Sequence, residues 1–133
     1  MTEIPFKLVV RAVIKNQDGK ILILKRSRDS RSNPCCWELP GGKVEPEEDF
    51  DKALIREIKE ETNLNIVLKK AAGIAQQDLP YSHSIHVIMN VKVISGDLKI
   101  SHEHEEYQWA FLDEIKTLKL SEWFYELIKE KEI

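Results

Sequence analysis

The feature that most constrains the fold is a helical segment at residues 48–62, which lies between segments with the pattern of β-strands. It contains neither glycine nor proline and is rich in helix-favouring residues. The segment before it, residues 6–15, is largely apolar and β-branched. Residues 83–94, after it, alternate apolar and polar side chains as a half-buried strand does. The chain is therefore expected to cover a sheet with this helix.

Other segments extend the same pattern. The predicted strands are residues 6–15, 21–24, 66–77, 83–94 and 107–112. The turn at 16–19 joins the first two in a predicted hairpin, and residues 27–36 form a polar loop. A second helix, with Ser121 as its N-cap, carries an apolar stripe made of Leu120, Trp123, Phe124, Leu127 and Ile128. We expect one domain over residues 1–133, of the α/β (α+β) class, with a mixed sheet sandwiched by helices.

Composition narrows the range of partners. The chain has 20 Lys and Arg against 23 Asp and Glu, and the basic residues form no tract, so long nucleic acid is not an expected partner. The apolar runs are too short for a signal peptide or a membrane span, which predicts a cytoplasmic protein. Adjacent Cys35 and Cys36 offer neither a disulfide nor zinc spacing. His83, His86, His102 and His104 are interpreted as ordinary polar residues.

The helix at 48–62 also carries chemistry. At about 100° per residue, Glu57, Glu60 and Glu61 lie on or beside the apolar arc, and the basic side chains lie opposite. The apolar arc contains Phe50, Ala53, Leu54 and Ile58, and the opposite side contains Lys52, Arg56 and Lys59. Carboxylates crowded beside an apolar stripe stay ionised only if a cation neutralises them. Mg²⁺ fits this set of oxygen ligands, with Mn²⁺ as a substitute. The alternative is a solvated face with i,i+4 pairs such as Arg56 with Glu60.

These residues resemble a known motif. Gly42, Glu48 and the run Arg56 to Leu64 are similar to the Nudix box, which here spans residues 42–64. One fixed position differs, because Asn63 stands where the family has glycine. Asparagine is the next most tolerant residue in the left-handed conformation of a helix C-cap, so the change is conservative. Trp37 to Lys43, and Glu103 six residues before Trp109, resemble the MutT-like branch of that family.

The resemblance implies roles for individual residues. Glu57, Glu60 and Glu61 would bind the metal with the Gly42 carbonyl and Glu103, and Glu48 would be a more distant metal or supporting group. Glu57 would double as the base, and Arg56 would orient a carboxylate of the box. The residues expected to contact substrate are Arg26, Glu38 and Gly41. The alternative for Arg26 is a solvated strand end.

The implied activity is Mg²⁺-dependent hydrolysis of a phosphoanhydride bond in a nucleoside di- or triphosphate, including oxidised dNTPs. A nucleoside monophosphate and pyrophosphate or phosphate would be released by a monomer or homodimer. The alternative substrates are ADP-ribose and dinucleoside polyphosphates, for which Pro80 and Tyr81 point in different directions. Two alternatives of other classes are a non-catalytic nucleotide-binding module and a helix that holds a structural cation.

Overall fold

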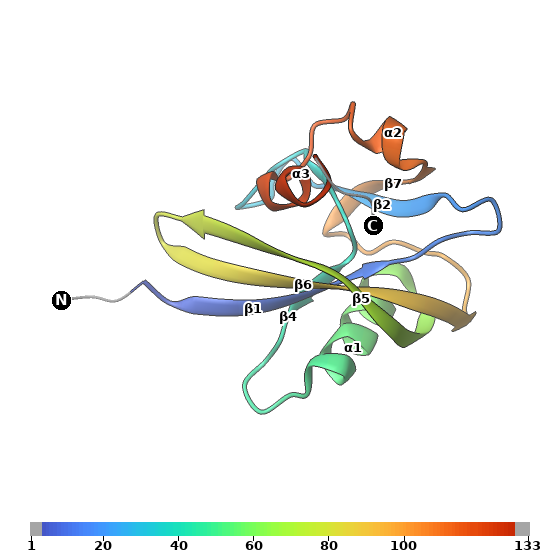
Figure 1. Cartoon of the computed structure of the whole chain (residues 1–133), viewed down its shortest axis with the longest axis horizontal. Helices are drawn as coiled ribbons and strands as arrows, with labels where there is room; N and C mark the ends of the chain where they lie inside the picture. The colour runs from blue at the N-terminus through green and yellow to red at the C-terminus, as the bar shows by residue number, and fades with distance from the viewer. Residues whose placement is uncertain (1–3, 130–133) are drawn as a thin grey trace.

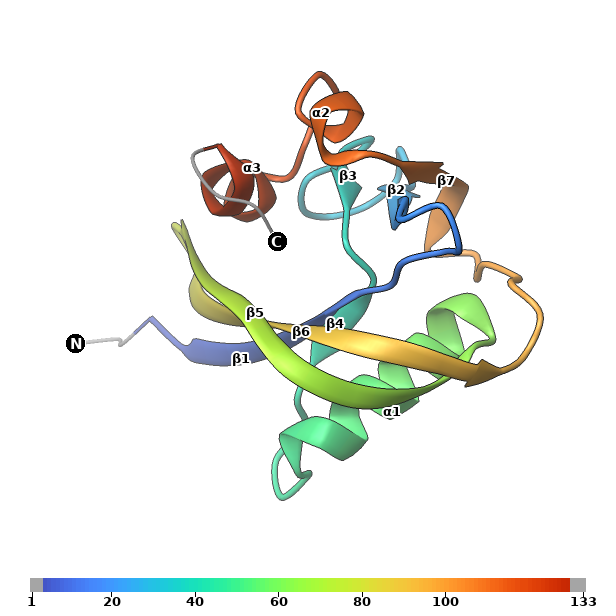
Figure 2. The ribbon, with the colours of Figure 1, turned by 45° about the vertical axis from the view of Figure 1, so that its right-hand side comes forward.

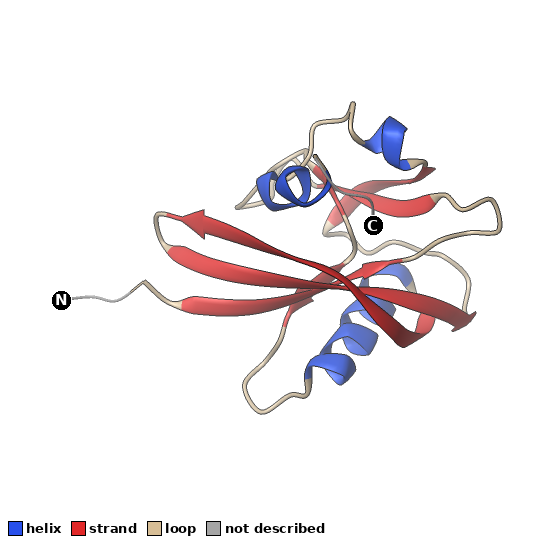
Figure 3. Cartoon of the chain, viewed as in Figure 1, coloured by secondary structure: helices blue, strands red, loops and turns tan. Residues whose placement is uncertain are grey.

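The computed structural model describes residues 4–129 and contains two β-sheets and three helices (Figures 1 and 3). The larger sheet has the order β4 (Gly41–Lys43), β1 (Phe6–Val13), β6 (Ser82–Ser95), β5 (Asn65–Leu79). The smaller sheet has the order β3 (Trp37–Glu38), β2 (Ile21–Arg26), β7 (His104–Ala110). The helices are α1 (Phe50–Thr62), α2 (Leu112–Ile115) and α3 (Glu122–Ile128).

The larger sheet is mixed, because β1 runs parallel to β6 and antiparallel to β4. Helix α1 covers one face of this sheet, and α3 lies across the other face (Figure 2). Each side has its own apolar core, one around Leu54 and Ile58 of α1 and one around Trp123 and Phe124 of α3. The predicted α+β class with a mixed sheet between helices is confirmed. The smaller sheet and α2 were not anticipated.

The predicted hairpin of residues 6–15 and 21–24 is wrong beyond its turn. The turn closes as expected, since the Asn16 N–H donates to the Lys20 carbonyl at 2.9 Å, and Lys15 bridges to Ile21. From there the two strands part into different sheets. Both edges of β1 are occupied by β4 and β6, so β2 has no free edge of β1 to pair with. A local turn signal cannot reveal such competition from distant strands.

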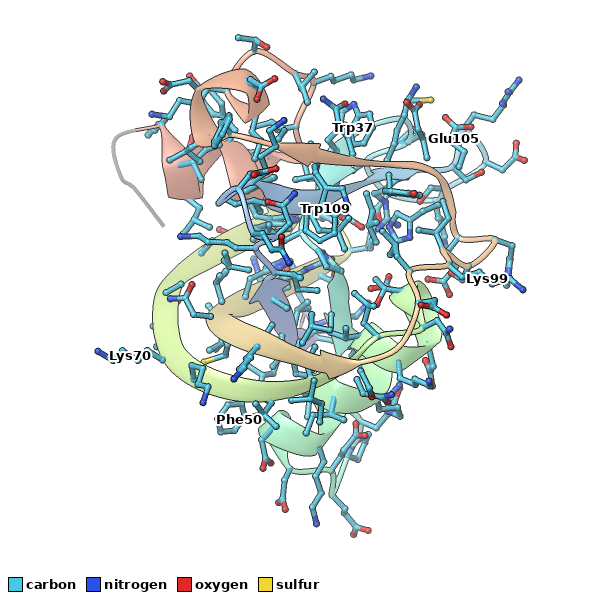
Figure 4. The ribbon with its side chains drawn as sticks, turned by 90° about the vertical axis from the view of Figure 1, so that its right-hand side faces the viewer. Trp37, Phe50, Lys70, Lys99, Glu105 and Trp109 are labelled. Atoms are coloured by element: carbon cyan, nitrogen blue, oxygen red, sulfur yellow. The ribbon has the colours of Figure 1, made fainter. Side chains whose placement is uncertain are left out.

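Several element boundaries differ from the prediction. Helix α1 begins at Phe50 after the N-cap Asp49, not at residue 48. The last strand covers residues 104–110, and Leu112 begins α2 instead of ending that strand. Ser121 is the N-cap of α3 as predicted, although its side chain makes no capping hydrogen bond. Phe50, predicted on the buried arc, is 45% exposed at the periphery of the molecule (Figure 4), because it lies in the first turn of the helix.

The C-terminal end of α1 is fastened to the segment after β6. Asn63 ends the helix with φ 64° and ψ 12°, the predicted left-handed conformation, and its Nδ2 donates to the Asp97 carbonyl at 3.0 Å. The N–H groups of Lys99 and Ser101 donate to the carbonyls of Thr62 and Glu61 at 2.9 and 3.1 Å. These bonds satisfy carbonyls that a helix end leaves open. Lys99, labelled in Figure 4, marks this segment.

The Asn63 cap leads to a stability prediction. We expect Asn63→Gly to unfold within about 1 kcal/mol of the wild type, because glycine tolerates the conformation but loses the bond to Asp97. Asn63→Val should be destabilised by at least roughly 1 kcal/mol, because a β-branched residue is strained there. Thermal melts of the two variants make the comparison, and equal melting temperatures would contradict it.

Among residues 4–129, every helix is too short or too polar to cross a bilayer.

Candidate active site

Two adjacent glycines bring the backbone of β4 against the carboxylates of α1. The Gly41 N–H donates to Oε1 of Glu61 at 2.7 Å. A Cβ atom on Gly41 would lie 2.0 Å from the Val10 carbonyl oxygen, and one on Gly42 would lie 2.4 Å from the carboxylate carbon of Glu57. Only glycine allows both contacts, so the Gly41–Gly42 start of β4 lies directly against two acids of the helix.

Burial and neighbouring acids make the ionised forms of Glu57 and Glu61 unfavourable. Burial raises the pKa of Glu57, and the charges of Glu60 and Glu103 add to that rise while Arg56 opposes it. Burial also raises the pKa of Glu61 well above its usual range, with the charges of Glu38 and Glu57 adding to it. Partly or fully buried acids that repel one another beside the backbone of Gly41 and Gly42 match what a hard divalent cation needs.

Arg56 binds three acids. Its Nε donates to Glu48 at 2.7 Å, and its Nη1 lies 2.9 Å from Glu57 and 3.3 Å from Glu60. Hydrogen bonds from Arg56 lower the pKa of Glu48 to about 2, and the bonds to Glu48 and Glu57 raise the pKa of Arg56. The predicted position of Arg56 opposite the carboxylates is therefore wrong. Its long side chain reaches around the helix to them, as the predicted role of orienting a box carboxylate requires.

Glu60 and Glu103 are less enclosed than the other acids. The Glu60 side chain is 59% exposed, so its predicted place on the inward arc is wrong, and it makes the i,i+4 pair with Arg56 that the surface-helix alternative anticipated. Glu103 is exposed at the end of the segment that begins at Asp97. Within residues 4–129, no three His, Cys, Asp or Glu side chains already stand close enough together to hold a metal. Glu57 and Glu61, against the Gly41–Gly42 backbone, form the part of the predicted site that the structure brings together.

Glu38 forms a second, fully buried acidic centre. Its Oε2 lies 2.9 Å from Arg26, 3.0 Å from Nε2 of His104 and 3.5 Å from Arg11. Burial alone would raise the pKa of Glu38, but Arg11, the hydrogen bond from His104 and Arg26 together lower it to about 2. The Glu38 side chain is 1% exposed. This enclosure does not favour the predicted direct contact with substrate and points instead to a role in organising its neighbours.

Arg26 is not a solvated strand end. Its Nε donates to the Ser32 carbonyl at 2.8 Å and its Nη2 to Oγ of Ser30 at 2.6 Å, so it organises the loop at 27–36. Arg26 and Glu103 line one cavity of about 320 Å³. This shared cavity brings the predicted substrate residue and one predicted metal ligand to the same place.

The NUDIX domain family profile matches residues 5–130. The chain belongs to the Nudix family. The predicted recognition of that family is confirmed, and the box at 42–64 runs from Gly42 of β4 through helix α1 to the Asn63 cap.

Named relatives of this Nudix chain act on several nucleotides. It is 36% identical over 109 residues to the ADP-ribose pyrophosphatase of Methanocaldococcus jannaschii, covering 79% of this chain but only 62% of that protein, less than two thirds. It is 35% identical over 107 residues to the CTP pyrophosphohydrolase of Escherichia coli K12, covering 80% of this chain and 76% of the relative. With the nucleoside triphosphatase NudI of Klebsiella pneumoniae (strain ATCC 700721), it shares 30% identity over 86% of this chain and 89% of the relative.

Solved structures agree with the MutT-like assignment. The crystal structure of a MutT protein from Methanosarcina mazei Go1 superposes with a TM-score of 0.88 at 35% identity, over 97% of this chain and 94% of that one. The solution structure of the E. coli ORF135 protein gives a TM-score of 0.82 at 29% identity, over 95% and 88% of the two chains.

Two residues of this Nudix site were missed in the sequence. Arg11 is buried within β1, where its Nη1 donates to the Leu39 carbonyl at 3.0 Å and its guanidinium lies 4.8 Å from the Trp123 ring. An arginine inside the apolar run of residues 6–15 was the available signal. His104, interpreted as an ordinary polar residue, is buried between Glu38 and Glu61. No spacing in the sequence indicated that position.

Proposed function

We propose that this Nudix chain is a Mg²⁺-dependent pyrophosphohydrolase that cleaves a phosphoanhydride bond of a nucleoside triphosphate. The supporting observation is the placement of Glu57 and Glu61 against the Gly41–Gly42 backbone of β4, with the pKa of both acids raised by burial. The intact acids argue against a binding module without activity. The family membership and the hydrolase names of its relatives support the reaction class.

The residues that would hold the cation are those that supply oxygen atoms at this site. Glu57 and Glu61 lie against the backbone of β4, and the Gly42 carbonyl, Glu60 and Glu103 are the further oxygen donors that the resemblance implies. A bound divalent cation withdraws charge from phosphate oxygens and lowers the pKa of a bound water. Mg²⁺ suits an all-oxygen set, and Mn²⁺ can take its place.

Side chains of the protein would carry out the remaining steps of the reaction. Nη1 of Arg56 donates to Oε1 of Glu57 at 2.9 Å and holds that oxygen in place. The other oxygen, Oε2, receives no hydrogen bond from Arg56 and would accept the proton of the attacking water. Glu48 would hold Arg56 in place through its two hydrogen bonds at 2.7 and 3.0 Å. Arg26, in the cavity that Glu103 also lines, would contact the phosphates or the base.

A substrate screen tests the proposal. We expect at least one canonical or oxidised dNTP to be cleaved faster than ADP-ribose or diadenosine polyphosphates when the loss of each substrate and its nucleotide products are followed by chromatography with Mg²⁺. ADP-ribose is the second candidate, because one relative carries that name and Tyr81, beside Pro80, is 54% exposed at the edge of a second cavity. A tenfold or greater preference for ADP-ribose, about 1.4 kcal/mol in the barrier, would reverse the ranking.

The free thiols of Cys35 and Cys36 support the predicted reducing, cytoplasmic compartment.

A further inference from the structure

His104 lies outside the Nudix box, at the start of β7, yet its imidazole stands between two buried acids. Its Nε2 is 3.0 Å from Oε2 of Glu38, and its Nδ1 is 3.7 Å from Oε2 of Glu61. The three side chains are 1%, 1% and 5% exposed for His104, Glu38 and Glu61. A polar ring enclosed to this degree needs partners on both nitrogens, and the two carboxylates are the groups that face them.

The second nitrogen is only partly satisfied. At 3.7 Å, Nδ1 is beyond hydrogen-bonding distance from Glu61, and it has no other partner among residues 4–129. Glu61 is held from its other side, because the Gly41 N–H donates to Oε1 at 2.7 Å. His104 therefore faces the carboxylate oxygen of Glu61 to which Gly41 does not donate.

The imidazole also connects separate parts of the fold. Glu38 belongs to β3 and is held by Arg26 of β2 and Arg11 of β1. Glu61 belongs to α1, and His104 touches both acids. A displacement of the Glu61 carboxylate away from Gly41 would therefore push His104 against an ion-paired cluster anchored in both sheets.

We propose that His104 is a positioning residue that holds the Glu61 carboxylate in place for the divalent cation. This inference rests on the proposed function, in which Glu61 is a ligand. Partners that hold a carboxylate or imidazole ligand from behind restrict its orientation, and their loss weakens metal binding by roughly ten- to a hundredfold. His104 contributes by bracing Glu61 against the Glu38 cluster and makes no contact with substrate.

Two substitutions and one control test the role. His104→Phe fills the space without a nitrogen, and His104→Gln keeps an amide that can reach one carboxylate. His83→Gln is the control, because His83 lies on β6 and binds Asp78. The melting temperature of each full-length protein is measured during a Mg²⁺ titration without nucleotide, which reports metal binding directly. Values of kcat and KM for the best nucleotide at saturating Mg²⁺ complete the set.

We expect His104→Phe to need at least about tenfold more Mg²⁺ than the wild type for half of the melting-temperature shift. Its KM should stay within about twofold of the wild type while kcat falls, because the substrate contacts remain. His104→Gln should lie between the two, and His83→Gln should match the wild type. If His104→Phe does not fold, His104→Gln carries the same comparison.

A second background shows whether the effect passes through Glu61. In Glu61→Gln, adding His104→Phe should change the Mg²⁺ midpoint by less than about twofold. An equal increase of the Mg²⁺ midpoint in both backgrounds would overturn the role. A His104→Phe protein that kept the wild-type Mg²⁺ midpoint and only melted at a lower temperature would overturn it as well. A wild type that neither responds to Mg²⁺ nor hydrolyses any nucleotide would remove the proposed function and this role together. A responsive wild type with unaltered His104 variants would remove this role alone.

Discussion

Replacing Glu57 or Glu61 with glutamine is expected to reduce kcat by at least about a hundredfold, and Glu60→Gln is expected to do the same. Glutamine keeps the size of the side chain and removes the charge that a cation requires. Steady-state kinetics with Mg²⁺ and the best nucleotide measure the effect. Full activity in both Glu60→Gln and Glu61→Gln would contradict the assignment of these acids as ligands.

The same variants should differ in stability. Burial raises the pKa of Glu61, so its ionised form costs folding free energy at neutral pH, and Glu61→Gln should melt at or above the wild-type temperature without metal. The amide oxygen can still accept from the Gly41 N–H. Glu60→Gln loses only an exposed pair with Arg56, which contributes at most a few tenths of a kcal/mol. A helix face held by surface pairs alone would instead show unchanged activity in both.

Glu38→Gln is expected to produce the largest loss of stability, roughly 3–5 kcal/mol, because it removes the anion that Arg11 and Arg26 share in a buried setting. Urea unfolding at pH 7 measures the loss. Glu105→Gln is the matched control, since Glu105 makes a more exposed pair with Lys25 at 3.6 Å and should cost less than about 1 kcal/mol.

The lowered pKa of Glu38 also determines how this loss of stability depends on pH. The pKa of Glu38 is about 2 in the folded protein and near 4.5 in the unfolded chain. The stability that Glu38 contributes is therefore complete above the unfolded pKa and disappears as the pH falls from about 4.5 toward 2. The gap between wild type and Glu38→Gln should narrow over that range. A gap that stays constant with pH would show that the loss at pH 7 does not come from the charge.

Most of the features that the sequence predicted correctly depend on residues close together in the chain. The α1 helix and the two long strands β5 and β6 follow from periodicity over a few residues, and the left-handed Asn63 follows from its place in the box and the tolerance of asparagine for that conformation. The family and the fold class followed from the box, and both are confirmed. The roles of the individual site residues remain predictions.

The remaining features depend on contacts between distant parts of the chain. Glu38 and His104 are 66 residues apart, and Arg11 reaches Glu38 only because β1 lies beside the β3–β4 connection. The separation of β1 from β2 likewise depends on which strands compete for each edge of β1. The buried face of α1 includes Glu61 but not Glu60, so the exposure of the Glu60 carboxylate depends on how the helix packs against the sheet. No pattern within a short segment contains this information.

The bonds that tie Asp97, Lys99 and Ser101 to the end of α1 limit how the motif could be transplanted. Residues 42–64 are continuous in sequence, yet the last carbonyls of the helix are satisfied by a segment more than thirty positions later. A scaffold that received the box alone would have to hydrate these carbonyls and would leave Glu103 behind. A graft meant to reproduce the site therefore has to carry two separate pieces, residues 41–64 and 97–104, joined in the register seen here.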